Sequence, residues 1–292
     1  SPNARQRKSS RRNPPIAKRR RFEAGANPTN ERITMLLEGK NAVVYGGGGK
    51  VGGAVARAFA SEGARVFLAG RTIATLDEVA EDIASAGGVA ETAQVDALDE
   101  QSIDIHIGEV MERVGSVDIS FNAISIQDVQ LIPLVEMSRE DFMRPISTGT
   151  ATHFLTARAA ARRMVTQGSG VILTFSASAV RAFFPGVYVG GFGIACTAIE
   201  ALTKQLAAEV GQDGIRVNCL RSEGIPESWE GASTDEWSAP PEEIEAFLKQ
   251  RSLLGRLTTL ADVGNAAAFL ASDRAAATTG TVFNLTSGTV VD

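Results

Sequence analysis

Short apolar segments recur along the chain and alternate with stretches in which apolar residues follow the 3.6-residue period of a helix. Continuous apolar segments of this kind are typical of strands that helices cover on both faces. Strands joined through helices by right-handed crossovers predict a doubly wound α/β fold, with a seven-stranded, mostly parallel sheet between two helical layers. The strands are predicted near residues 41–45, 65–69, 90–95, 117–121, 170–175, 215–219 and 282–285.

The first predicted strand leads into a glycine-rich segment, Gly46-Gly47-Gly48-Gly49-Lys50-Val51-Gly52, and then into a helix. Glycines at such a junction leave backbone N–H groups and the positive end of a helix dipole open to an anion, for example a pyrophosphate. A glycine-rich turn without a ligand is the alternative, and the strand before and the helix after favour nucleotide binding. The apolar face of the helix is predicted to contain Val51, Ala54, Val55, Ala58 and Phe59.

The ends of the next strands carry polar residues, and ligands of this fold class bind beyond the carboxyl ends of the strands. The second strand is followed by Arg71 and not by the acidic residue that would bind the ribose hydroxyls of NAD. Arg71 can pair with a 2′-phosphate, and Lys50 lies within reach of the same region, so NADP(H) is favoured over NAD(H). The alternative is that Arg71 is an ordinary solvated residue. Asp96, after the third strand, is a candidate acceptor for the adenine amino group.

Composition and charge restrict the function classes. The net charge of −5 divides into +8 for residues 1–34 and −13 for the remainder, and an acidic body does not fit a nucleic-acid-binding protein. No apolar run reaches the roughly 18 residues that a membrane span needs. The chain has two cysteines without metal-ligand spacing and two histidines, so we expect no metal site and a cytoplasmic location.

Residues 1–34 are predicted to be a disordered basic extension, because they contain Arg19-Arg20-Arg21 and Pro14-Pro15 but almost no apolar periodicity. A nucleic-acid arm, an organelle-targeting peptide and a nuclear localisation signal are possible functions of such a segment. The favoured interpretation is an extension ahead of the natural domain start, since Met35-Leu36-Leu37 resembles such a start. Residues 35–292 are then one domain.

From residue 36 to residue 292 the sequence resembles the short-chain dehydrogenase/reductase family, whose fold is of the Rossmann type. The glycine signature resembles Tyr45–Gly52, although Lys50 stands at its second glycine and Tyr45 at its threonine. The resemblance implies an oxidoreductase that uses a nicotinamide dinucleotide. Further matching motifs are Asp96-Ala97, Phe121-Asn122-Ala123-Ile124, Gly214-Ile215-Arg216-Val217-Asn218, Leu254-Gly255-Arg256, Asp262-Val263, Phe269-Leu270-Ala271-Ser272-Asp273 and Thr279-Gly280. The implied cofactor-binding residues are Gly46, Gly48, Gly49, Lys50, Val51, Gly52, Arg71, Asp96, Ala97, Asn122, Ala123 and Ile225.

The residues that usually catalyse the reaction in this family are replaced. Its Tyr-x-x-x-Lys pair corresponds to Phe192 and Cys196, which can neither transfer a proton as tyrosine does nor supply a positive charge. Its serine aligns with Ala177, between Ser176 and Ser178, and its helix asparagine aligns near Gly149. Its Pro-Gly after the sixth strand corresponds to Ser222-Glu223.

Tyr188 is a candidate proton donor, because the segment 188–196 resembles the enoyl-acyl-carrier-protein reductases, a branch with a longer Tyr-to-Lys spacing. An ordinary loop aromatic is the alternative. Ser176, Ser178 and Tyr188 are therefore the candidate catalytic residues. His153 can act as an acid or base only if it faces the cleft, and Cys196 has no evident basic partner. The family's mobile substrate lid corresponds to about 226–250, with Trp229 and Trp237.

Two functions remain open on the sequence. The first is an NAD(P)(H)-dependent oxidoreductase for a small carbonyl or enoyl substrate. The second is a catalytically impaired relative that binds a dinucleotide or serves as a partner subunit. A third interpretation is that Lys50 and Tyr45 close the dinucleotide cleft, so that no cofactor binds. The resemblance also implies a homo-dimer or tetramer that forms through helices at 139–164 and 192–211.

Overall fold

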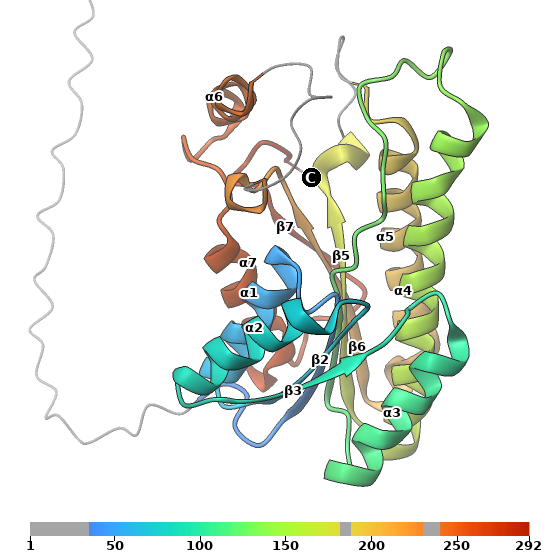
Figure 1. Cartoon of the computed structure of the whole chain (residues 1–292), viewed down its shortest axis with the longest axis vertical. Helices are drawn as coiled ribbons and strands as arrows, with labels where there is room; N and C mark the ends of the chain where they lie inside the picture. The colour runs from blue at the N-terminus through green and yellow to red at the C-terminus, as the bar shows by residue number, and fades with distance from the viewer. Residues whose placement is uncertain (1–34, 182–187, 230–239, 292) are drawn as a thin grey trace, which may run out of the picture. The chain divides into compact units, whose positions relative to one another are not determined.

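The computed structural model describes residues 35–181, 188–229 and 240–291, and residues from Met35 onward form one compact unit. Its centre is a seven-stranded sheet in the order β3-β2-β1-β4-β5-β6-β7, in which every neighbouring pair is parallel (Figure 1). The strand order reverses between β1 and β4, which is where ligands bind in doubly wound sheets. The strands are β1 Asn41–Tyr45, β2 Arg65–Gly70, β3 Val89–Gln94, β4 Ile119–Asn122, β5 Gly170–Ala177, β6 Ile215–Ser222 and β7 Val282–Leu285.

Helices cover both faces of the sheet. α1, α2 and α7 lie on one face, and α3, α4 and α5 lie on the other (Figure 1). α6 lies beyond the carboxyl ends of the strands, and no residue of α6 is buried. The helices are α1 Lys50–Ser61, α2 Ile73–Ser85, α3 Glu100–Val114, α4 Arg139–Gln167, α5 Gly190–Val210, α6 Pro241–Arg251 and α7 Leu260–Ala271.

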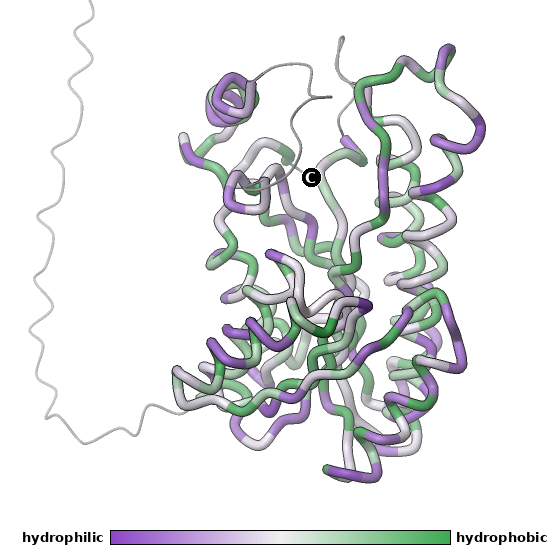
Figure 2. The backbone as a smooth tube through the Cα atoms, in the orientation of Figure 1, coloured by the Kyte–Doolittle hydropathy of each residue, from purple (hydrophilic) through white to green (hydrophobic). Residues whose placement is uncertain are grey.

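The alternation of side chains along β1 divides the interior into two cores. Ala42 and Val44 pack with residues of α1, α2 and α7, whereas Val43 and Tyr45 pack with residues of α3, α4 and α5. Successive residues of a strand point to opposite faces, so a fully apolar strand supplies both cores at once. Figure 2 shows the hydrophobic residues concentrated along the strands and the polar residues along the outer turns.

Side-chain caps fix the ends of several helices. The Ser138 hydroxyl accepts a hydrogen bond from the Asp141 N–H at the start of α4, and Thr259 and Asp262 form a reciprocal capping box at the start of α7. α3 ends at Gly115, whose φ of +80° is a left-handed conformation that glycine adopts without strain.

The predicted fold class is confirmed, and the predicted strands agree with the structure to within a few residues. The largest difference is at β5 and β6, which pair over eight residues and continue to Ala177 and Ser222. The predicted strands were too short because their last residues include Arg221 and serines, which are uncommon in buried strands.

The buried face of α1 also differs from the prediction. Val55 and Phe59 are buried as predicted, but Val51, Ala54 and Ala58 are only half-buried. Gly52, Gly53 and Ala56 are buried as well, because helices pack closely through residues without large side chains, and Val51 packs against the core with part of its surface exposed. The Ala54–Ala58 side of the helix lies against Gly264 of α7, where an added Cβ would be 2.9 Å from the Ala58 Cβ.

Several sequence-based expectations concern residues outside the described part of the chain. They are the disorder of residues 1–34 and the contribution of Trp237 to a lid. Trp229 and α6, which belong to the same predicted lid at 226–250, are described. Within the described residues, none of the helices has the length and apolar character needed to cross a membrane.

Candidate active site

The glycine-rich segment forms a tight turn between β1 and α1, at the point where the strand order reverses. Gly46 has a φ of +75°, and a Cβ added there would be 2.8 Å from the Ala123 carbonyl oxygen. A Cβ added at Gly52 would overlap the Gly46 carbonyl oxygen. Both positions therefore require glycine if the loops after β1 and β4 are to approach each other and the helix is to approach the turn.

The N-terminus of α1 is open at this turn. Gly49 is the N-cap residue and makes no side-chain capping bond, the first turn of α1 contains no acidic residue, and Gly49 and Lys50 are exposed. The N–H groups of the first turn of a helix, the helix dipole and a lysine cation together favour a phosphate group. A Cβ added at Gly46 or Gly52 would collide with backbone atoms at this turn, so the turn keeps its shape only with glycine, and the residues present fit a dinucleotide pyrophosphate.

Tyr45 does not close the cleft. Its side chain is 1% exposed and lies in the core on the α3 side, edge-on to the His106 ring with the centroids 6.2 Å apart. Burial raises the pKa of Tyr45 above its usual value and lowers the pKa of His106 to about 4. The interpretation that Tyr45 helps to close the dinucleotide cleft is therefore wrong.

The other predicted cofactor residues lie along the carboxyl edge of the sheet. Arg71 is exposed directly after β2, and Asp96 is exposed after β3, where its Oδ1 accepts a hydrogen bond of 3.0 Å from the Leu98 N–H. Ala97 and Ile225 are buried beside this edge. The Asn122 side chain donates to Thr156 Oγ1 and accepts from the Ile124 N–H, both at 2.9 Å, so this amide shapes the turn after β4.

Two of the three candidate catalytic residues bind carboxylates. The buried Ser176 hydroxyl donates to Glu200 Oε1 at 2.9 Å, which favours a structural role for Ser176. The Ser178 hydroxyl, directly beyond the end of β5, donates to Glu223 Oε1 at 2.6 Å. The third candidate, Tyr188, has 43% of its surface exposed, and its backbone carbonyl accepts a hydrogen bond from the Leu131 N–H. The structure therefore does not bring the Tyr188 phenol into a bonded group with the two serines.

The positions of the family's tyrosine and lysine lie where the sequence places them, at the start of α5. Phe192 is half-buried, and Cys196 is 1% exposed and within hydrogen-bond reach of the Ala177 backbone. Burial raises the pKa of Cys196 to about 12, so this thiol is neutral near pH 7 and is a poor nucleophile.

His153 is a packed histidine on α4. Its side chain is 1% exposed, and Nδ1 lies 2.9 Å from the Gly149 carbonyl oxygen. Burial lowers the pKa of His153 to about 4, against smaller opposing effects of the Gly149 and Asn122 backbone. The ring therefore does not face the cleft as an acid or base.

Sequence reasoning missed a buried ion pair beneath the site. Arg221 of β6 and Glu200 of α5 are both buried, and the guanidinium Nε and Nη2 lie 2.8 and 2.9 Å from the two carboxylate oxygens. A signal was present, because Glu200 lies within the apolar run Ala198–Leu202 and Arg221 directly follows the apolar pair Cys219-Leu220. Opposite charges inside two adjacent elements indicate an ion pair.

Sequence reasoning also missed the surroundings of Glu223. It noted Glu223 only as a departure from the family's Pro-Gly. In the structure the carboxylate accepts hydrogen bonds from Ser178 Oγ at 2.6 Å, from the Gly224 N–H at 3.1 Å and from Thr289 Oγ1 at 2.7 Å. The nearest local clue was the position of Glu223 directly after a strand that ends at the same edge as β5. Its contact with Thr289, 66 residues further along the chain, had no sequence signal.

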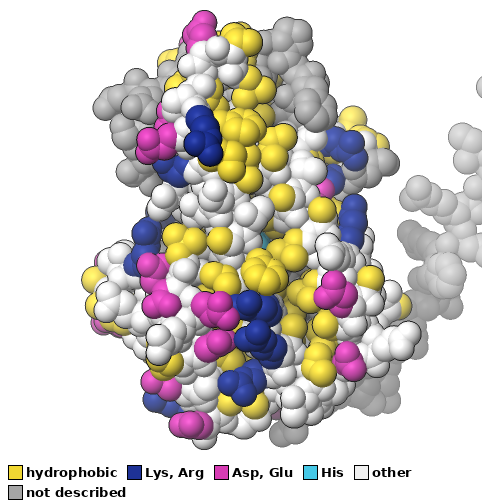
Figure 3. All heavy atoms as spheres, turned by 90° about the vertical axis from the view of Figure 1, so that its right-hand side faces the viewer, with side chains coloured by type: hydrophobic (Ala, Val, Ile, Leu, Met, Phe, Trp, Pro, Cys, Tyr) yellow, Lys and Arg dark blue, Asp and Glu magenta, His cyan; other side chains and the backbone are white. Residues whose placement is uncertain are grey.

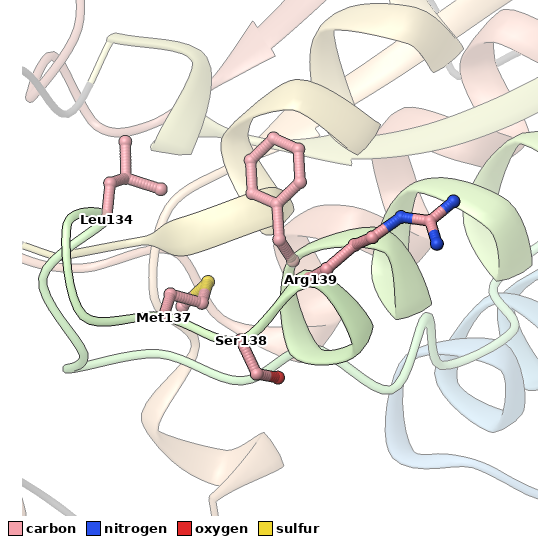
Figure 4. Close-up of a pocket in the computed structure, with 5 residues that line it drawn as sticks. Leu134, Met137, Ser138 and Arg139 are labelled. Carbon is pink, nitrogen blue, oxygen red and sulfur yellow. The ribbon is translucent and has the colours of Figure 1, made fainter.

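A pocket of about 450 Å³ opens between the loop after β4 and the start of α4 (Figure 4). It is lined mainly by apolar side chains, and Arg139 points away from Leu134 and Met137. A Cβ added at Gly190 would lie 2.5 Å from Met137 Cε, which places the pocket beside the start of α5. The lining residues are Leu134, Met137, Ser138, Arg139 and Phe142. Among the described residues no group of three or more His, Cys, Asp or Glu side chains is arranged to hold a metal ion.

Comparison with known proteins agrees with this geometry. Residues 49–289 match the family model described as enoyl-(acyl carrier protein) reductase. The chain is 33% identical over 261 residues to a 3alpha-hydroxysteroid dehydrogenase of Mediterraneibacter gnavus, an alignment that covers 86% of this chain and 97% of that protein.

Solved structures share the fold. A gluconate 5-dehydrogenase from Burkholderia cenocepacia J2315, solved with NADP and tartrate, gives a TM-score of 0.77 at 25% identity, covering 88% of this chain and 97% of the other. An NAD⁺-bound xylitol dehydrogenase also gives a TM-score of 0.77, at 23% identity, covering 86% of this chain and 99% of the other. The motifs, the family match and the relatives agree, and the chain belongs to the short-chain dehydrogenase/reductase family of oxidoreductases.

Proposed function

We propose that this chain is an NADP(H)-dependent oxidoreductase that interconverts a carbonyl or enoyl group and its reduced form in a small, largely apolar substrate. The observation that carries the proposal is the glycine turn at the open N-terminus of α1, with Lys50 in it and Arg71 beside it. A bound nicotinamide dinucleotide supplies or accepts the hydride in such a reaction. The protein binds both molecules, orients them and excludes water.

The preference for NADP(H) rests on charge at the end of β2. Arg71 stands where an acidic residue would bind the ribose hydroxyls of NAD, and a guanidinium is suited to a 2′-phosphate. The N–H groups of Gly46 and Gly47 both donate to the Ala69 carbonyl oxygen near the end of β2, so the glycine turn before Lys50 and the end of β2 before Arg71 belong to the same region of the edge. The two solved relatives carry NADP in one case and NAD⁺ in the other, so the choice depends on the residues of this chain.

Titration of the chain with NADPH and with NADH, followed by nicotinamide fluorescence, tests this preference. We expect tighter binding of NADPH, and Arg71→Ala should weaken it by on the order of tenfold, or about 1.4 kcal/mol, while it leaves NADH binding nearly unchanged. The matched control is Arg65→Ala, at the opposite end of the same strand and also exposed. Equal affinity for the two cofactors, or an equal loss of affinity in both variants, would exclude Arg71 as the 2′-phosphate residue.

The apolar substrate class rests on the pocket at the rim of the site. Leu134, Met137 and Phe142 line it, and it adjoins the start of α5 near Tyr188. One relative is named a 3alpha-hydroxysteroid dehydrogenase, and the carbon skeleton of a steroid is apolar. Turnover of NADPH with a panel of aliphatic and alicyclic ketones and enoyl thioesters tests this class, with a polyol and NADP⁺ as the contrasting substrate.

A second function is favoured by one specific observation. Phe192 and Cys196 occupy the positions of the family's tyrosine and lysine, and the Cys196 thiol is neutral. A dinucleotide-binding protein or partner subunit without turnover fits this loss. Saturable NADPH binding with no turnover of any compound in the panel would support it, and turnover would exclude it.

We also propose that the chain forms a homo-oligomer through α4 and α5. Apolar side chains gather on the face that α4 presents, with Lys and Arg side chains among them (Figure 3). Phe154 and Val165 of α4 and Ile194 of α5 are 46%, 42% and 52% exposed, respectively. Exposed apolar patches of this kind mark interaction surfaces. A cytoplasmic location is proposed as well, because Cys196 and Cys219 are buried free thiols.

A further inference from the structure

The carboxylate of Glu223 joins three segments that meet at the carboxyl edge of the sheet. It lies directly after β6 and accepts hydrogen bonds from Ser178, which follows β5, and from Thr289, which follows β7. The Gly224 N–H also donates to Oε1. Ligands of doubly wound sheets bind beyond these strand ends, and the carboxylate lies in the half of the edge formed by β5, β6 and β7, away from β1, β2 and β3.

The hydrogen bond between Ser178 and Glu223 has a defined direction. A hydroxyl has one proton and two lone pairs, and the Ser178 proton is directed to Glu223 Oε1 at 2.6 Å. The oxygen of Ser178 can therefore accept a hydrogen bond from a substrate hydroxyl while its own proton faces a carboxylate. This is the arrangement of a proton relay that ends on a base.

The second carboxylate oxygen is fixed separately. Oε2 accepts from Thr289 Oγ1 at 2.7 Å, while the Thr289 N–H donates to the Thr286 carbonyl oxygen and holds Thr289 in a turn. Oε1 is left to Ser178 and to the Gly224 N–H. Thr289 is therefore a positioning residue that sets the rotation of the carboxylate toward Ser178.

Apolar side chains border this group. A Cβ added at Gly224, next to Glu223, would lie 2.8 Å from Trp229 Cζ2 and 2.9 Å from Leu248 Cδ1. Trp229 and Leu248 belong to the predicted lid segment 226–250. Aromatic and aliphatic groups exclude water, so a carboxylate beside them exchanges protons with a bound substrate more readily than with water.

We propose that Ser178 and Glu223 form the proton-transfer pair of this site, in place of the tyrosine and lysine that the chain lacks. The inference rests on the proposed oxidoreductase function. Ser178 contacts the substrate oxygen, and Glu223 is the base in oxidation and the acid in reduction.

The step balances with NADP⁺ as the only co-reactant. When an alcohol is oxidised, its O–H proton passes to Ser178 Oγ as the Ser178 proton passes to Glu223 Oε1. The carbinol C–H bond breaks, and its electron pair leaves with hydrogen as hydride to the bound dinucleotide. The substrate becomes a carbonyl compound and Glu223 becomes a carboxylic acid, which then releases its proton to water. Reduction is the reverse.

Substitution of Glu223 by Gln separates proton transfer from shape, because the amide is isosteric and can still accept through its oxygen. We expect kcat to fall by about 10²- to 10⁴-fold in Glu223→Gln and in Ser178→Ala, with the KM for substrate changed by less than about fivefold. In Glu223→Ala, added formate should restore part of the rate in a saturable manner. The matched control is Glu62→Gln, at the end of α1, whose carboxylate also accepts a backbone hydrogen bond, from the Leu36 N–H.

Cofactor binding gives a readout that does not depend on turnover. A carboxylate close to the nicotinamide favours the positively charged oxidised ring, so Glu223→Gln should weaken NADP⁺ binding by roughly three- to tenfold relative to NADPH. Glu62→Gln should leave this ratio unchanged. Calorimetric titration of each protein with both cofactors measures it.

The outcomes separate this inference from the proposed function. Wild-type turnover that is retained in Glu223→Gln, or lost there without formate rescue of Glu223→Ala, overturns the pair while the oxidoreductase function stands. If the wild-type chain binds NADPH saturably but turns over none of the ketones and enoyl thioesters, the proposal that Ser178 and Glu223 transfer protons in catalysis is wrong. Absence of dinucleotide binding overturns the proposed function and the pair together.

Discussion

The guanidinium of Arg221 and the carboxylate of Glu200 are paired in the interior of the protein, with side chains that are 4% and 9% exposed. The pair joins β6 to α5, and the same carboxylate accepts the hydroxyl of Ser176 on β5. Three elements beneath the candidate active site are thus connected by one buried carboxylate. A charge in this position is tolerated because its partner is also buried.

Loss of one partner from this pair should destabilise the protein strongly. We expect Arg221→Met and Glu200→Gln each to reduce the free energy of unfolding by about 3–5 kcal/mol, because each leaves an uncompensated buried group. The double variant should lose less free energy of unfolding than the sum of the losses in the two single variants. Urea denaturation of the four proteins in a double-mutant cycle measures the coupling. The control is the exposed pair Arg57–Asp82, where Arg57→Ala should cost only about 0–1 kcal/mol. Additive losses at positions 200 and 221 would contradict the pairing.

The same substitution should have opposite effects at two helical glycines. Gly52→Ala places a methyl group on the Gly46 carbonyl oxygen, and overpacking of this kind typically costs about 1–3 kcal/mol. It should also abolish saturable NADPH binding. Gly108→Ala, inside α3, adds its Cβ to open space and should stabilise the protein by about 0.5–1 kcal/mol. Thermal unfolding and NADPH titration of both variants distinguish the outcomes. Normal cofactor binding by Gly52→Ala would show that the turn is not the phosphate cradle.

Stability should decrease with acidification because two histidines are buried in their neutral form. The pKa of both His106 and His153 is lowered from 6.5 to about 4 by burial. The unfolded chain therefore binds more protons than the native protein between pH 6.5 and 4. Above pH 6.5 both histidines are neutral in the folded and the unfolded chain, and the free energy of unfolding has its full value. As the pH falls toward 4 the unfolded chain gains protons that the folded protein does not, and the free energy of unfolding decreases by up to about 3 kcal/mol for each histidine.

Chemical denaturation at pH 7 and at pH 4.5 measures this loss. His153→Gln and His106→Phe should each show a smaller difference between the two pH values than the wild type, whatever their stability at pH 7. Contributions from carboxylates are common to all three proteins and cancel in the comparison. An unchanged pH difference in both variants would mean that neither histidine is protonated on unfolding.

Assembly should depend on the exposed apolar residues of α4 and α5. Ile194→Glu or Phe154→Glu introduces a charge that an apolar interface cannot accommodate, so each variant should shift the chain toward the monomer. Light scattering coupled to gel filtration gives the mass directly. The control is Leu254→Glu, which alters an exposed apolar residue outside these helices. A wild-type chain that is monomeric at micromolar concentration would refute the proposed interface.

The sequence predicts the layers of the fold because its buried strands are continuous apolar runs and its first turn needs glycine. The positions of Gly46, Gly52 and Arg71 at the carboxyl edge follow from that pattern. The contacts of Glu223 do not, because they depend on how far β5 and β6 extend and on a return of the chain after β7. Sequence periodicity carries no information about a hydrogen bond between a strand end and a threonine near the C-terminus.

The buried face of α1 is wider than the predicted apolar face for a similar reason. Apolar periodicity finds large side chains, whereas this helix packs through Gly52 and Gly53, which contribute no hydrophobicity. Tyr45 was assigned to the cleft because it adjoins the glycines. The pleat of β1 instead directs its side chain into the core beside His106.

The eight-residue pairing of β5 with β6 has a consequence for local opening. The amides of this ladder, up to the residues that precede Ser178 and Glu223, are protected by ladder bonds inside a sheet that is covered on both faces. Their deuterium exchange should therefore require global unfolding and report one common free energy of opening under native conditions. The turn at Gly46–Gly49 has no such ladder, so its amides should exchange through local fluctuations. A dinucleotide should then slow exchange at the glycine turn by far more than it slows exchange in β5 and β6. Adaptation to the ligand is thereby confined to the turn, and the ends of β5 and β6 stay rigid.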